Sequence, residues 1–491
     1  MKTGSATLVA LLAMAVLATV AHGSLVSVAR AVKAKAAAAG LGDGPRRRRA
    51  TPNAGTYAQR YYVNDTFFDG TGPVFLCMGG ETPLYDAVAI TGSYHCGFMV
   101  EVLARNHSAL ILALEHRFYG ASMPRPDLSV DSLKLLTTPQ ALADMASFVK
   151  YASTKFGLTS ANKWVTFGGS YPGMMAAWSR LFYPELIHAS VASSAPVQAQ
   201  VEFTGYLDVV AASMAAPIVG GSAECVDVLK AGYAAVGEML AGSAAQRAQL
   251  ASEFGVCSGA ASSLDDKANW VVFTESLGGL LPVQENDPAC TTPVCDIASV
   301  CSTALQVVKS GGKPYDAIAS INAIANAGQC LNVSYTGEMA ALMDTHPDPN
   351  SVNAIMRSWT WQTCTEYGYY QVCNPDSDCI SVSSPHLNDI ESYLVQCKQA
   401  FGVSPAETYA AANASNARTG GWNPHSSNIL WVNGAIDPWH ALSINKPVNG
   451  MPAIYVPGAS HHFWTHPPLP TDQQPIVAAR LAIAAQLQQW L

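Results

Sequence analysis

Charged residues are scarce in this sequence, and several features that would define a function class are missing. Only 13% of the 491 residues are charged, and the net charge is −8. From residue 57 on, 19 Lys and Arg stand against 34 Asp and Glu, so this part of the chain lacks the basic surface that nucleic acids and anionic membranes bind. No two cysteines have the C-x-x-C spacing of a zinc site, and we expect neither a metal ion nor another cofactor.

Long apolar runs are also lacking, with one short exception at the start of the chain. Residues 8–20 are largely apolar, Lys2 precedes them and small residues follow, which predicts a secretory signal peptide over residues 1–23. A membrane span needs about 20 apolar residues, so we expect none after signal removal; an uncleaved anchor is the alternative. Residues 24–56 combine alanines with four consecutive arginines, which predicts a disordered segment or a pro-peptide, with a basic nucleic-acid arm as the competing interpretation.

All twelve cysteines follow the predicted signal peptide. An even number of cysteines in an oxidising compartment predicts disulfides, although the sequence does not give their pairing. Four Asn-x-Ser/Thr sequences fit the same secretory route and predict glycosylation sites at Asn64, Asn106, Asn332 and Asn413. We therefore expect a protein that is secreted or kept in a lysosome-like compartment.

The stretch from Trp164 to Met174 contains the most informative pattern. An apolar run of strand type ends in paired glycines and Ser170, and a helix-compatible run follows. Strand, sharp turn and helix in this order are typical of a nucleophile elbow, which exposes a serine hydroxyl beside free backbone N–H groups. The last glycine of the usual G-x-S-x-G pattern is replaced by Pro172, which the first turn of a helix tolerates. An ordinary glycine-rich turn is the alternative interpretation.

An acid and a base follow in the order that an α/β-hydrolase requires. Residues 428–432 form a strand candidate that leads to Asp437, and residues 451–456 form another that leads to His461 and His462. Taken alone, these residues are also compatible with a turn aspartate and a surface histidine. Together with Ser170 they predict a catalytic triad.

A glycine loop provides a candidate for the second oxyanion donor. It follows the strand candidate at residues 73–78, which is where this fold places that donor. We assign one donor to the backbone N–H of Tyr171 and the other to that of Gly80 or Glu81. A simple glycine turn is the alternative.

The remaining pattern predicts a parallel sheet with an insertion. Strand candidates at residues 109–114 and 190–197 and an amphipathic helix at 139–156 alternate as in an α/β fold. Between residues 201 and 422, ten cysteines and many alanine-rich helical stretches replace this pattern. We predict an α/β-hydrolase core built from residues 57–200 and 423–491, with a large, mainly helical, disulfide-containing cap inserted at 201–422.

Five motifs carry a family resemblance. They are EHRFYG at 115–120, GGSYPGM at 168–174, QTCTEYG at 362–368, NGAIDPW at 433–439 and GASHH at 458–462. With them the chain resembles the serine peptidases that include lysosomal Pro-X carboxypeptidase, dipeptidyl peptidase II and thymus-specific serine protease, from about residue 57 to the end. The second and third motifs are most similar to the thymus-specific branch, and the charges of the first motif are expected to form a structural ion pair.

The resemblance implies the fold described above, a triad of Ser170, Asp437 and His461, and cleavage after proline. It also implies that Met174 and Trp439 line an apolar pocket for the proline ring. Two departures, at residues 440–443 and 463–464, lie beside the catalytic loops and bear on subsite preference.

The recognised end of the peptide stays open. A carboxypeptidase binds a free carboxylate, a dipeptidyl peptidase binds a free ammonium group, and an endopeptidase needs neither. Gly169 stands where other serine carboxypeptidases of this fold carry a carboxylate-binding Glu, and Glu366 is a candidate partner for the ammonium group. We expect peptide substrates and an exopeptidase. A prolyl endopeptidase, an esterase or lipase, and a catalytically silent binding protein are the alternatives, and a homodimer is among the assemblies left open.

Overall fold

The computed structural model describes residues 56–85, 94–374, 376–380 and 389–491. The predicted signal peptide and residues 24–55 lie outside these ranges. Seven strands form one sheet in the order β1-β3-β2-β4-β5-β8-β9, and all neighbours in it are parallel except β1 and β3. The strands are β1 (Tyr61–Asn64), β2 (Val74–Met78), β3 (Leu110–Leu114), β4 (Trp164–Gly169), β5 (Ala189–Ser193), β8 (Ile429–Gly434) and β9 (Ala453–Val456).

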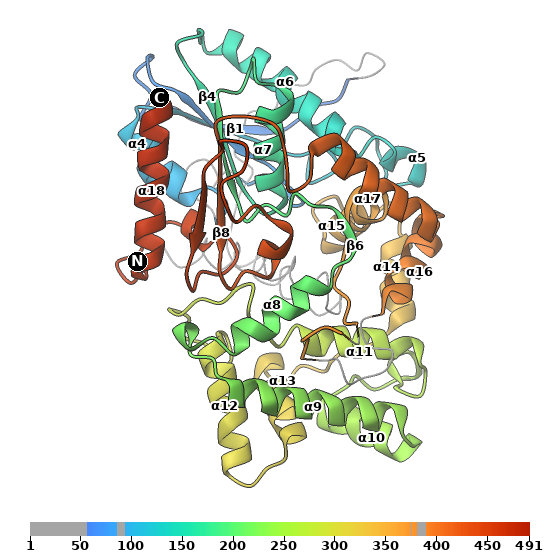
Figure 1. Cartoon of the computed structure of the whole chain (residues 1–491). Coiled ribbons are helices and arrows are strands. Elements are labelled where there is room, and N and C mark those ends of the chain that lie inside the picture. The colour runs from blue at the N-terminus through green and yellow to red at the C-terminus, as the bar shows by residue number, and fades with distance from the viewer. Residues whose placement is uncertain (1–55, 86–93, 375, 381–388) are drawn as a thin grey trace.

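Both faces of this sheet are covered by helices. Successive side chains of β2 belong to different hydrophobic clusters, Val74 to one and Phe75 to the other. The first cluster contains the buried residues of α6 (Thr138–Lys155) and α7 (Tyr171–Phe182), and the second contains those of α18 (Gln474–Trp490). Burial on both faces explains why the strands are continuously apolar. Figure 1 shows α7 and α18 on either side of the strands, as in the predicted α/β-hydrolase core.

A helical segment separates β5 from β8 along the chain. Figure 1 shows α9, α12 and α13 in a layer below the sheet. The segment also contains a two-stranded parallel sheet that the sequence did not predict, β6 (Gln200–Glu202) with β7 (Gly368–Tyr370). The division of the chain into core and cap at residues 201 and 422 stays a prediction. The longer helices are α8 (Thr204–Met214), α9 (Ala223–Ala241), α10 (Ala244–Glu253), α11 (Ala268–Gly278), α12 (Ile297–Lys309), α13 (Pro314–Asn326), α14 (Tyr335–Met343), α15 (Val352–Gln362), α16 (Ile390–Phe401) and α17 (Pro405–Thr419).

Short helical elements connect these parts. None of the helices in the described ranges combines the length and the apolarity that crossing a bilayer requires. The short elements are η1 (Met99–Leu103), α4 (Ala104–Asn106), α5 (Val130–Leu133), η2 (Pro217–Val219), η3 (Ala260–Ser262), η4 (Thr363–Tyr367), η5 (Pro438–Leu442) and η6 (Phe463–Thr465).

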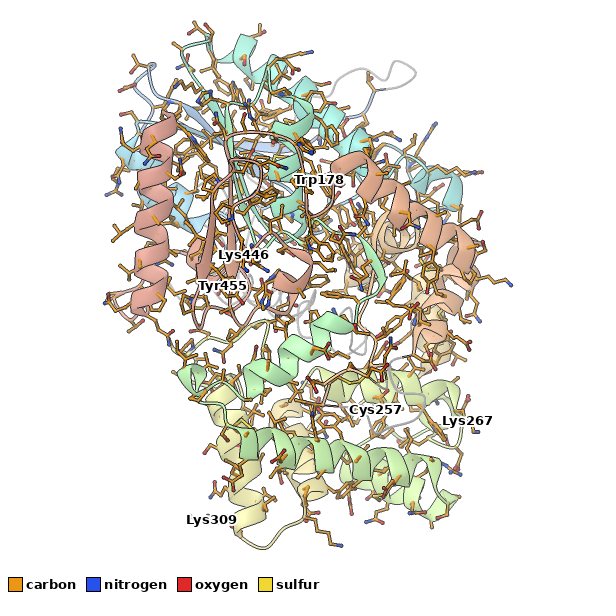
Figure 2. The ribbon with its side chains drawn as sticks, viewed as in Figure 1. Trp178, Cys257, Lys267, Lys309, Lys446 and Tyr455 are labelled. Carbon is orange, nitrogen blue, oxygen red and sulfur yellow. A yellow bond between two sulfur atoms is a disulfide. The ribbon has the colours of Figure 1, made fainter. Side chains whose placement is uncertain are left out.

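All twelve cysteines are paired, which confirms the predicted disulfides. One disulfide lies beside the sheet, and the other five lie in the segment between β5 and β8. Figure 2 labels Cys257, one of these, in the helical layer below the sheet. The pairs are Cys77–Cys96, Cys225–Cys301, Cys257–Cys330, Cys290–Cys295, Cys364–Cys397 and Cys373–Cys379.

The strand predicted at residues 190–197 is too long. β5 ends at Ser193, because Ser194 has a left-handed backbone with φ 45° that breaks the extended conformation. The sequence also missed β1, whose four residues are all half-buried and show no apolar alternation. The other predicted strands agree with β2, β3, β8 and β9 to within two residues.

Candidate active site

Ser170 stands at a strained turn between β4 and α7. Its backbone angles, φ 66° and ψ −135°, lie in a region that non-glycine residues rarely adopt, which is typical of a nucleophile elbow. Glycine neighbours make the turn possible. A Cβ on Gly168 would lie 2.2 Å from the carbonyl oxygen of Pro172, and one on Gly173 would lie 2.6 Å from that of Ser193. The strand, turn and helix predicted around Ser170 are therefore all present.

The predicted acid and base are hydrogen-bonded to each other. Asp437 follows β8 and is fully buried, and its Oδ1 accepts hydrogen bonds from His461 Nδ1 at 2.9 Å and from the backbone N–H of Trp439 at 3.0 Å. Within the described ranges, Nε2 of His461 is buried and has no hydrogen-bond partner. The imidazole is thus held through one nitrogen, and the other nitrogen is left for a reacting group.

The three residues predicted to form the triad lie at one edge of the sheet. β4, β8 and β9 are parallel, so the residues that follow them lie at the same edge. Ser170 and Trp439 line one pocket, and the ring of Trp439 lies 6.3 Å from that of His461 between centroids. Ser170, Asp437 and His461 thus follow parallel strands that end at the same edge of the sheet, and their action as a catalytic triad stays a prediction.

The second histidine of the pair has a different environment. The His462 backbone N–H donates to Ser194 Oγ at 2.8 Å, and a Cβ on Gly169 would lie 2.7 Å from the His462 ring. Burial, together with the nearby His461 and His95, lowers the pKa of His462 well below its usual value. The His462 ring therefore fills the space that a side chain at position 169 would need, which gives a physical reason for the glycine before Ser170.

The pocket beside Ser170 lies between the sheet and helices α11, α14 and α15. It contains about 1150 Å³ of empty space, counting its open mouth. One wall is apolar and includes Met174, Pro196, Tyr369 and Trp439. The Tyr369 and Trp439 rings meet edge to face at 5.5 Å, and the Tyr369 hydroxyl donates to the carbonyl oxygen of Pro196. Both residues predicted to contact a proline ring, Met174 and Trp439, thus line the same pocket as Ser170.

The glycine loop after β2 packs directly on the elbow. A Cβ on Gly80 would lie 2.4 Å from the Pro172 ring, and Glu81 lines the pocket. The N–H of Gly79 is bonded to the carbonyl oxygen of Leu114 at 2.9 Å, so the predicted donors are the next two N–H groups of the loop, of which that of Glu81 is also bonded to its own carboxyl group. The N–H of Tyr171 opens α7, where the first-turn amides have no intrahelical acceptor.

Residues of two sequence motifs form hydrogen bonds with Tyr171, directly after Ser170. Tyr171 OH is 2.9 Å from His116 Nε2 and accepts a hydrogen bond from Gln362 Nε2 at 3.0 Å, while Tyr119 OH donates to Gln362 Oε1 at 2.6 Å. Burial lowers the pKa of His116 to about 4, so this histidine is neutral. Residues of the EHRFYG and QTCTEYG motifs thus hold the side chain of Tyr171, the residue that follows Ser170.

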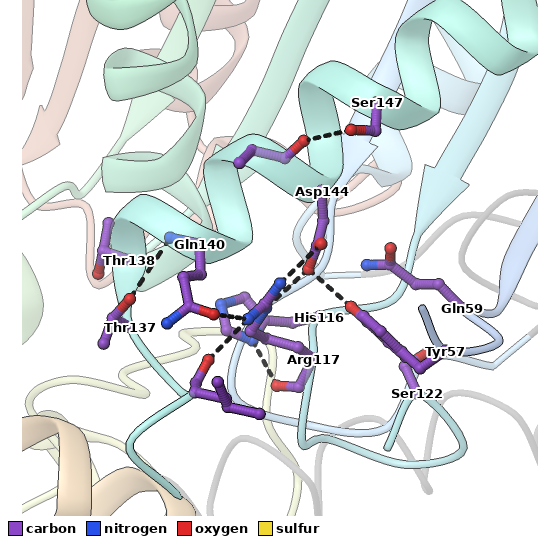
Figure 3. Close-up of polar contacts among 12 residues, drawn as sticks. Tyr57, Gln59, His116, Arg117, Ser122, Thr137, Thr138, Gln140, Asp144 and Ser147 are labelled. Carbon is purple, nitrogen blue, oxygen red and sulfur yellow. Dashed lines mark hydrogen bonds and ion pairs between the residues drawn. The ribbon is translucent and has the colours of Figure 1, made fainter. Parts of the chain in front are cut away.

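The charged members of the first motif pair with residues outside it. Arg117 binds Asp144 of α6 through two hydrogen bonds of 2.7 Å each, and Asp144 also accepts a hydrogen bond from Tyr57 (Figure 3). Glu115 lies 3.5 Å from Arg60 and accepts a hydrogen bond from Ser122. These ion pairs are structural, as the sequence analysis expected, although the partners lie elsewhere in the chain.

Glu366 does not line the pocket. It is 5% exposed, and its carboxylate accepts hydrogen bonds of 3.0 Å from the backbone N–H and the hydroxyl of Thr138, at the start of α6. Arg418 lies 3.8 Å away, and burial raises the pKa of Glu366 to about 7. The structure thus places this carboxylate at a helix N-terminus rather than where a substrate ammonium group would reach it.

Gln284 is one of several pocket residues that the sequence analysis did not identify. Gln284 accepts hydrogen bonds through Oε1 from Trp439 Nε1 at 2.7 Å and from Tyr206 OH at 2.9 Å, and its carbonyl oxygen accepts from the N–H of His461 at 3.1 Å. It belongs to an irregular stretch of the segment between β5 and β8. A lone glutamine far from the triad in sequence gives no signal that could have identified it.

The predicted glycosylation asparagines lie away from this pocket. Asn106 and Asn413 are exposed, whereas Asn64 and Asn332 are half-buried. Asn332 Oδ1 accepts hydrogen bonds from Ser262 Oγ and from the N–H of Ser334. Glycosylation of the four asparagines stays a prediction.

The described residues contain no group of three or more His, Cys, Asp or Glu side chains that could hold a metal ion.

Comparisons with known proteins identify a family and several similar proteins. Residues 50–483 match the model of the family described as serine carboxypeptidase S28. The chain is 36% identical over 444 residues to thymus-specific serine protease of Mus musculus, covering 89% of this chain and 84% of that protein. It is 26% identical to lysosomal Pro-X carboxypeptidase of Bos taurus, with coverage of 89% and 84%. Among solved structures, proline iminopeptidase of Mycobacterium smegmatis matches with 12% identity and a TM-score of 0.35, covering 89% of this chain and 96% of that chain.

Proposed function

Since the chain belongs to the serine carboxypeptidase S28 family of serine peptidases, we propose that it hydrolyses peptide bonds after proline, with Ser170, His461 and Asp437 as its catalytic residues. The observation that supports these roles best is the hydrogen bond of 2.9 Å between Asp437 and His461 beside the pocket that Ser170 lines. Peptides are therefore the proposed substrates.

The geometry suits an acyl-enzyme mechanism. Ser170 Oγ attacks the carbonyl carbon while Nε2 of His461 takes its proton, and Asp437 stabilises the imidazolium through Nδ1–H. The oxyanion is held by the N–H of Tyr171 and by that of Gly80 or Glu81. His461 then gives the proton to the leaving amine, which leaves an ester on Ser170. Water, deprotonated by His461, hydrolyses this ester and restores the free serine.

Preference for proline is proposed from the apolar wall of the pocket. Met174, Tyr369 and Trp439 present two aromatic rings and a flexible thioether next to the nucleophile. A proline ring has no N–H to satisfy and offers only apolar surface, so it suits such a wall better than a polar side chain does. The six disulfides and the relatives named lysosomal support a secretory route, with the mature protein in a lysosome-like compartment or outside the cell.

The proposal is tested with Ser170→Ala and a fluorophosphonate probe, which labels an activated serine. We expect the wild type to be labelled once, at Ser170, and to cleave prolyl peptides much faster than the same peptides with Ala in place of Pro. Ser170→Ala should lose both reactions while keeping the melting temperature of the wild type. Cleavage by purified Ser170→Ala would exclude Ser170 as nucleophile. Labelling without peptide cleavage would favour an esterase, and no labelling would favour a silent binding protein.

A further inference from the structure

Glu366 is linked to Tyr171, the residue after the proposed nucleophile, by two routes. In the first, the amide of Gln362 donates to the Tyr171 hydroxyl at 3.0 Å and also to Glu366. In the second, the Thr138 hydroxyl lies between Glu366 and the hydroxyl of Tyr367, whose ring packs against that of Tyr171 at 6.0 Å between centroids. Figure 3 shows Thr138 in the first turn of its helix. The carboxyl group therefore belongs to a buried polar network that reaches the elbow.

The direction of the hydrogen bonds around Tyr171 can be worked out. His116 Nδ1 lies 2.8 Å from the carbonyl oxygen of Arg117, which only accepts, so Nδ1 carries the proton of this neutral ring. Nε2 is then an acceptor, and the Tyr171 hydroxyl must donate to it. Since its proton is used in this way, Tyr171 can only accept from Gln362, and Gln362 Oε1 accepts from Tyr119. The second N–H of the Gln362 amide is left for Glu366.

Glu366 is the acceptor at the end of this network. The N–H and the hydroxyl of Thr138 and the amide of Gln362 all donate to it. An ionised carboxylate has acceptor sites for all three, whereas a protonated carboxyl group must place a proton of its own. The Thr138 hydroxyl would then have to turn from Glu366 to Tyr367, whose own proton needs a new acceptor. The network is therefore complete only while Glu366 is ionised.

Among the described residues that face it, Glu366 is the group whose charge changes near neutral pH. Burial raises its pKa to about 7. The guanidinium of Arg418 stays charged, and burial raises the pKa of each neighbouring tyrosine, so the phenols stay neutral. These tyrosines are Tyr119, Tyr171, Tyr367 and Tyr369. A fall in pH below 7 thus changes the network at Glu366.

We propose that Glu366 is a positioning residue, whose ionised carboxylate holds Tyr171 so that the Tyr171 backbone N–H points at the oxyanion, and that a proton on Glu366 slows acyl transfer. This inference rests on the proposed function, because it assumes that this N–H is an oxyanion donor. Glu366 does not line the pocket, and the oxyanion forms only during acyl transfer. The effect should therefore be found in kcat and not in KM.

The test is the rate at which a fluorophosphonate labels Ser170, compared between the wild type and Glu366→Gln from pH 5 to pH 8.5. The probe's phosphoryl oxygen uses the oxyanion site whichever end of a peptide the enzyme recognises. Glutamine has the shape of a protonated glutamate, and the titration of His461 is common to both proteins and cancels in the ratio. We expect the wild type to react about 10- to 100-fold faster at pH 8.5, as for lost charge-assisted hydrogen bonds. The ratio should fall towards 1 at pH 5, with a midpoint near pH 7.

Steady-state kinetics on a prolyl peptide provides the second readout, in which kcat should fall in Glu366→Gln while KM is kept. The matched control is Asp296→Asn, which also removes a carboxylate from a helix N-terminus. Asp296 Oδ1 accepts a hydrogen bond from the N–H of Ser299 at 2.8 Å, and Asp296 does not line the pocket. This control should match the wild type at every pH.

A ratio that is the same at pH 5 and pH 8.5 overturns the inference, because a merely structural role does not depend on the charge of Glu366. A loss confined to KM, or an equal pH-dependent loss in Asp296→Asn, also overturns it. If Glu366→Gln does not fold, Thr138→Val removes the hydroxyl between Glu366 and Tyr367. This variant should be labelled more slowly above pH 7, and an unchanged rate there overturns the inference. Failure of the proposed function is distinct, because the wild type is then not labelled at Ser170.

Discussion

The substitution Gly169→Ala adds one methyl group and tests how closely the turn at Ser170 packs against the loop that contains His461 and His462, called the histidine loop below. Gly169 has no left-handed φ, so alanine can adopt its backbone conformation without strain. The obstacle is the His462 ring, whose Cγ and Cδ2 would lie 2.7 and 2.8 Å from the new Cβ. These distances are about 1 Å shorter than an ordinary carbon–carbon contact. Gly169→Ala must therefore displace His462, the neighbour of the proposed base.

The size of the effect expected for Gly169→Ala depends on how tightly His462 is packed. It is 1% exposed, and its ring lies 4.5 Å from that of His461 and 4.9 Å from that of His95. Overpacking of a closed core costs about 1–3 kcal/mol. If the strain moves His461 away from Ser170, this cost appears as a loss of about 5- to 150-fold in kcat/KM. If the histidine loop holds, the same cost appears as lower stability against urea.

A double-mutant cycle separates this contact from other effects. Gly169→Ala, His462→Ala and the double variant are compared in kcat/KM and in the free energy of unfolding. Removal of the ring should relieve the clash, so we expect the double variant to be better than the sum of the single effects by about 1–3 kcal/mol. The reasoning is refuted if Gly169→Ala matches the wild type in both measurements, or if the two changes are additive.

Three further predictions follow from the described contacts. Asp437→Asn should lower kcat on the order of 10⁴-fold, which is the size of this effect in other serine peptidase triads. Steady-state kinetics would measure the loss, and a melting curve would check that the variant is folded. A loss below tenfold would contradict the proposed role of Asp437. Replacing Cys225 and Cys301 by Ala opens a loop with a sequence separation of 76 residues, so urea unfolding should show a loss of about 4 kcal/mol, and an unchanged midpoint would contradict this. Burial raises the pKa of Glu81 and Glu366 to about 7 and that of Glu275 to about 8, so the folded protein holds protons that the unfolded chain has released. The stability that they contribute is complete below about pH 4.5 and is lost as the pH rises to 8. Exposed histidines of the unfolded chain, with a pKa near 6.5, are largely neutral above about pH 7. The melting temperature should therefore fall between about pH 7 and pH 8, and a rise over this range would contradict the assignment.

Local patterns in the sequence were sufficient for the elbow and most of the sheet. The strand that ends at Gly169 and the helix that starts at Tyr171 depend on apolar runs and on small residues within about ten positions. Asp437 and His461 could be placed because each follows a buried strand of the same parallel sheet. In each case one short segment predicts the local structure around the residue. The order serine, acid, histidine along the chain of an α/β-hydrolase then predicts the role of each residue.

The direction in which a buried carboxyl group points could not be predicted. Glu366 belongs to a motif shared with peptidases, yet its side chain accepts hydrogen bonds from Thr138, more than 200 residues away in sequence. Glu81 was considered only for its backbone N–H, because nothing in the Gly-Gly-Glu stretch shows that its side chain is buried beside the pocket. The partner of a polar side chain is decided by tertiary packing, which a local pattern does not contain.

The segment between β5 and β8 does more than cover the pocket, because it also holds His461, the proposed base, in place. Gln284 bonds the backbone N–H of His461 and the indole of Trp439, and Ser460 Oγ donates to the carbonyl oxygen of Asn286 at 2.8 Å. The histidine loop is thus fixed on one side by the sheet and on the other by a loop more than 170 residues earlier in the chain. We therefore expect a change in this segment that moves residues 284–286 to alter the position of His461 and, if His461 is the base as proposed, the rate of acyl transfer. Substrate preference and catalytic rate should consequently be coupled in variants of this loop, whereas variants of α9 or α10, which do not line the pocket, should leave both unchanged.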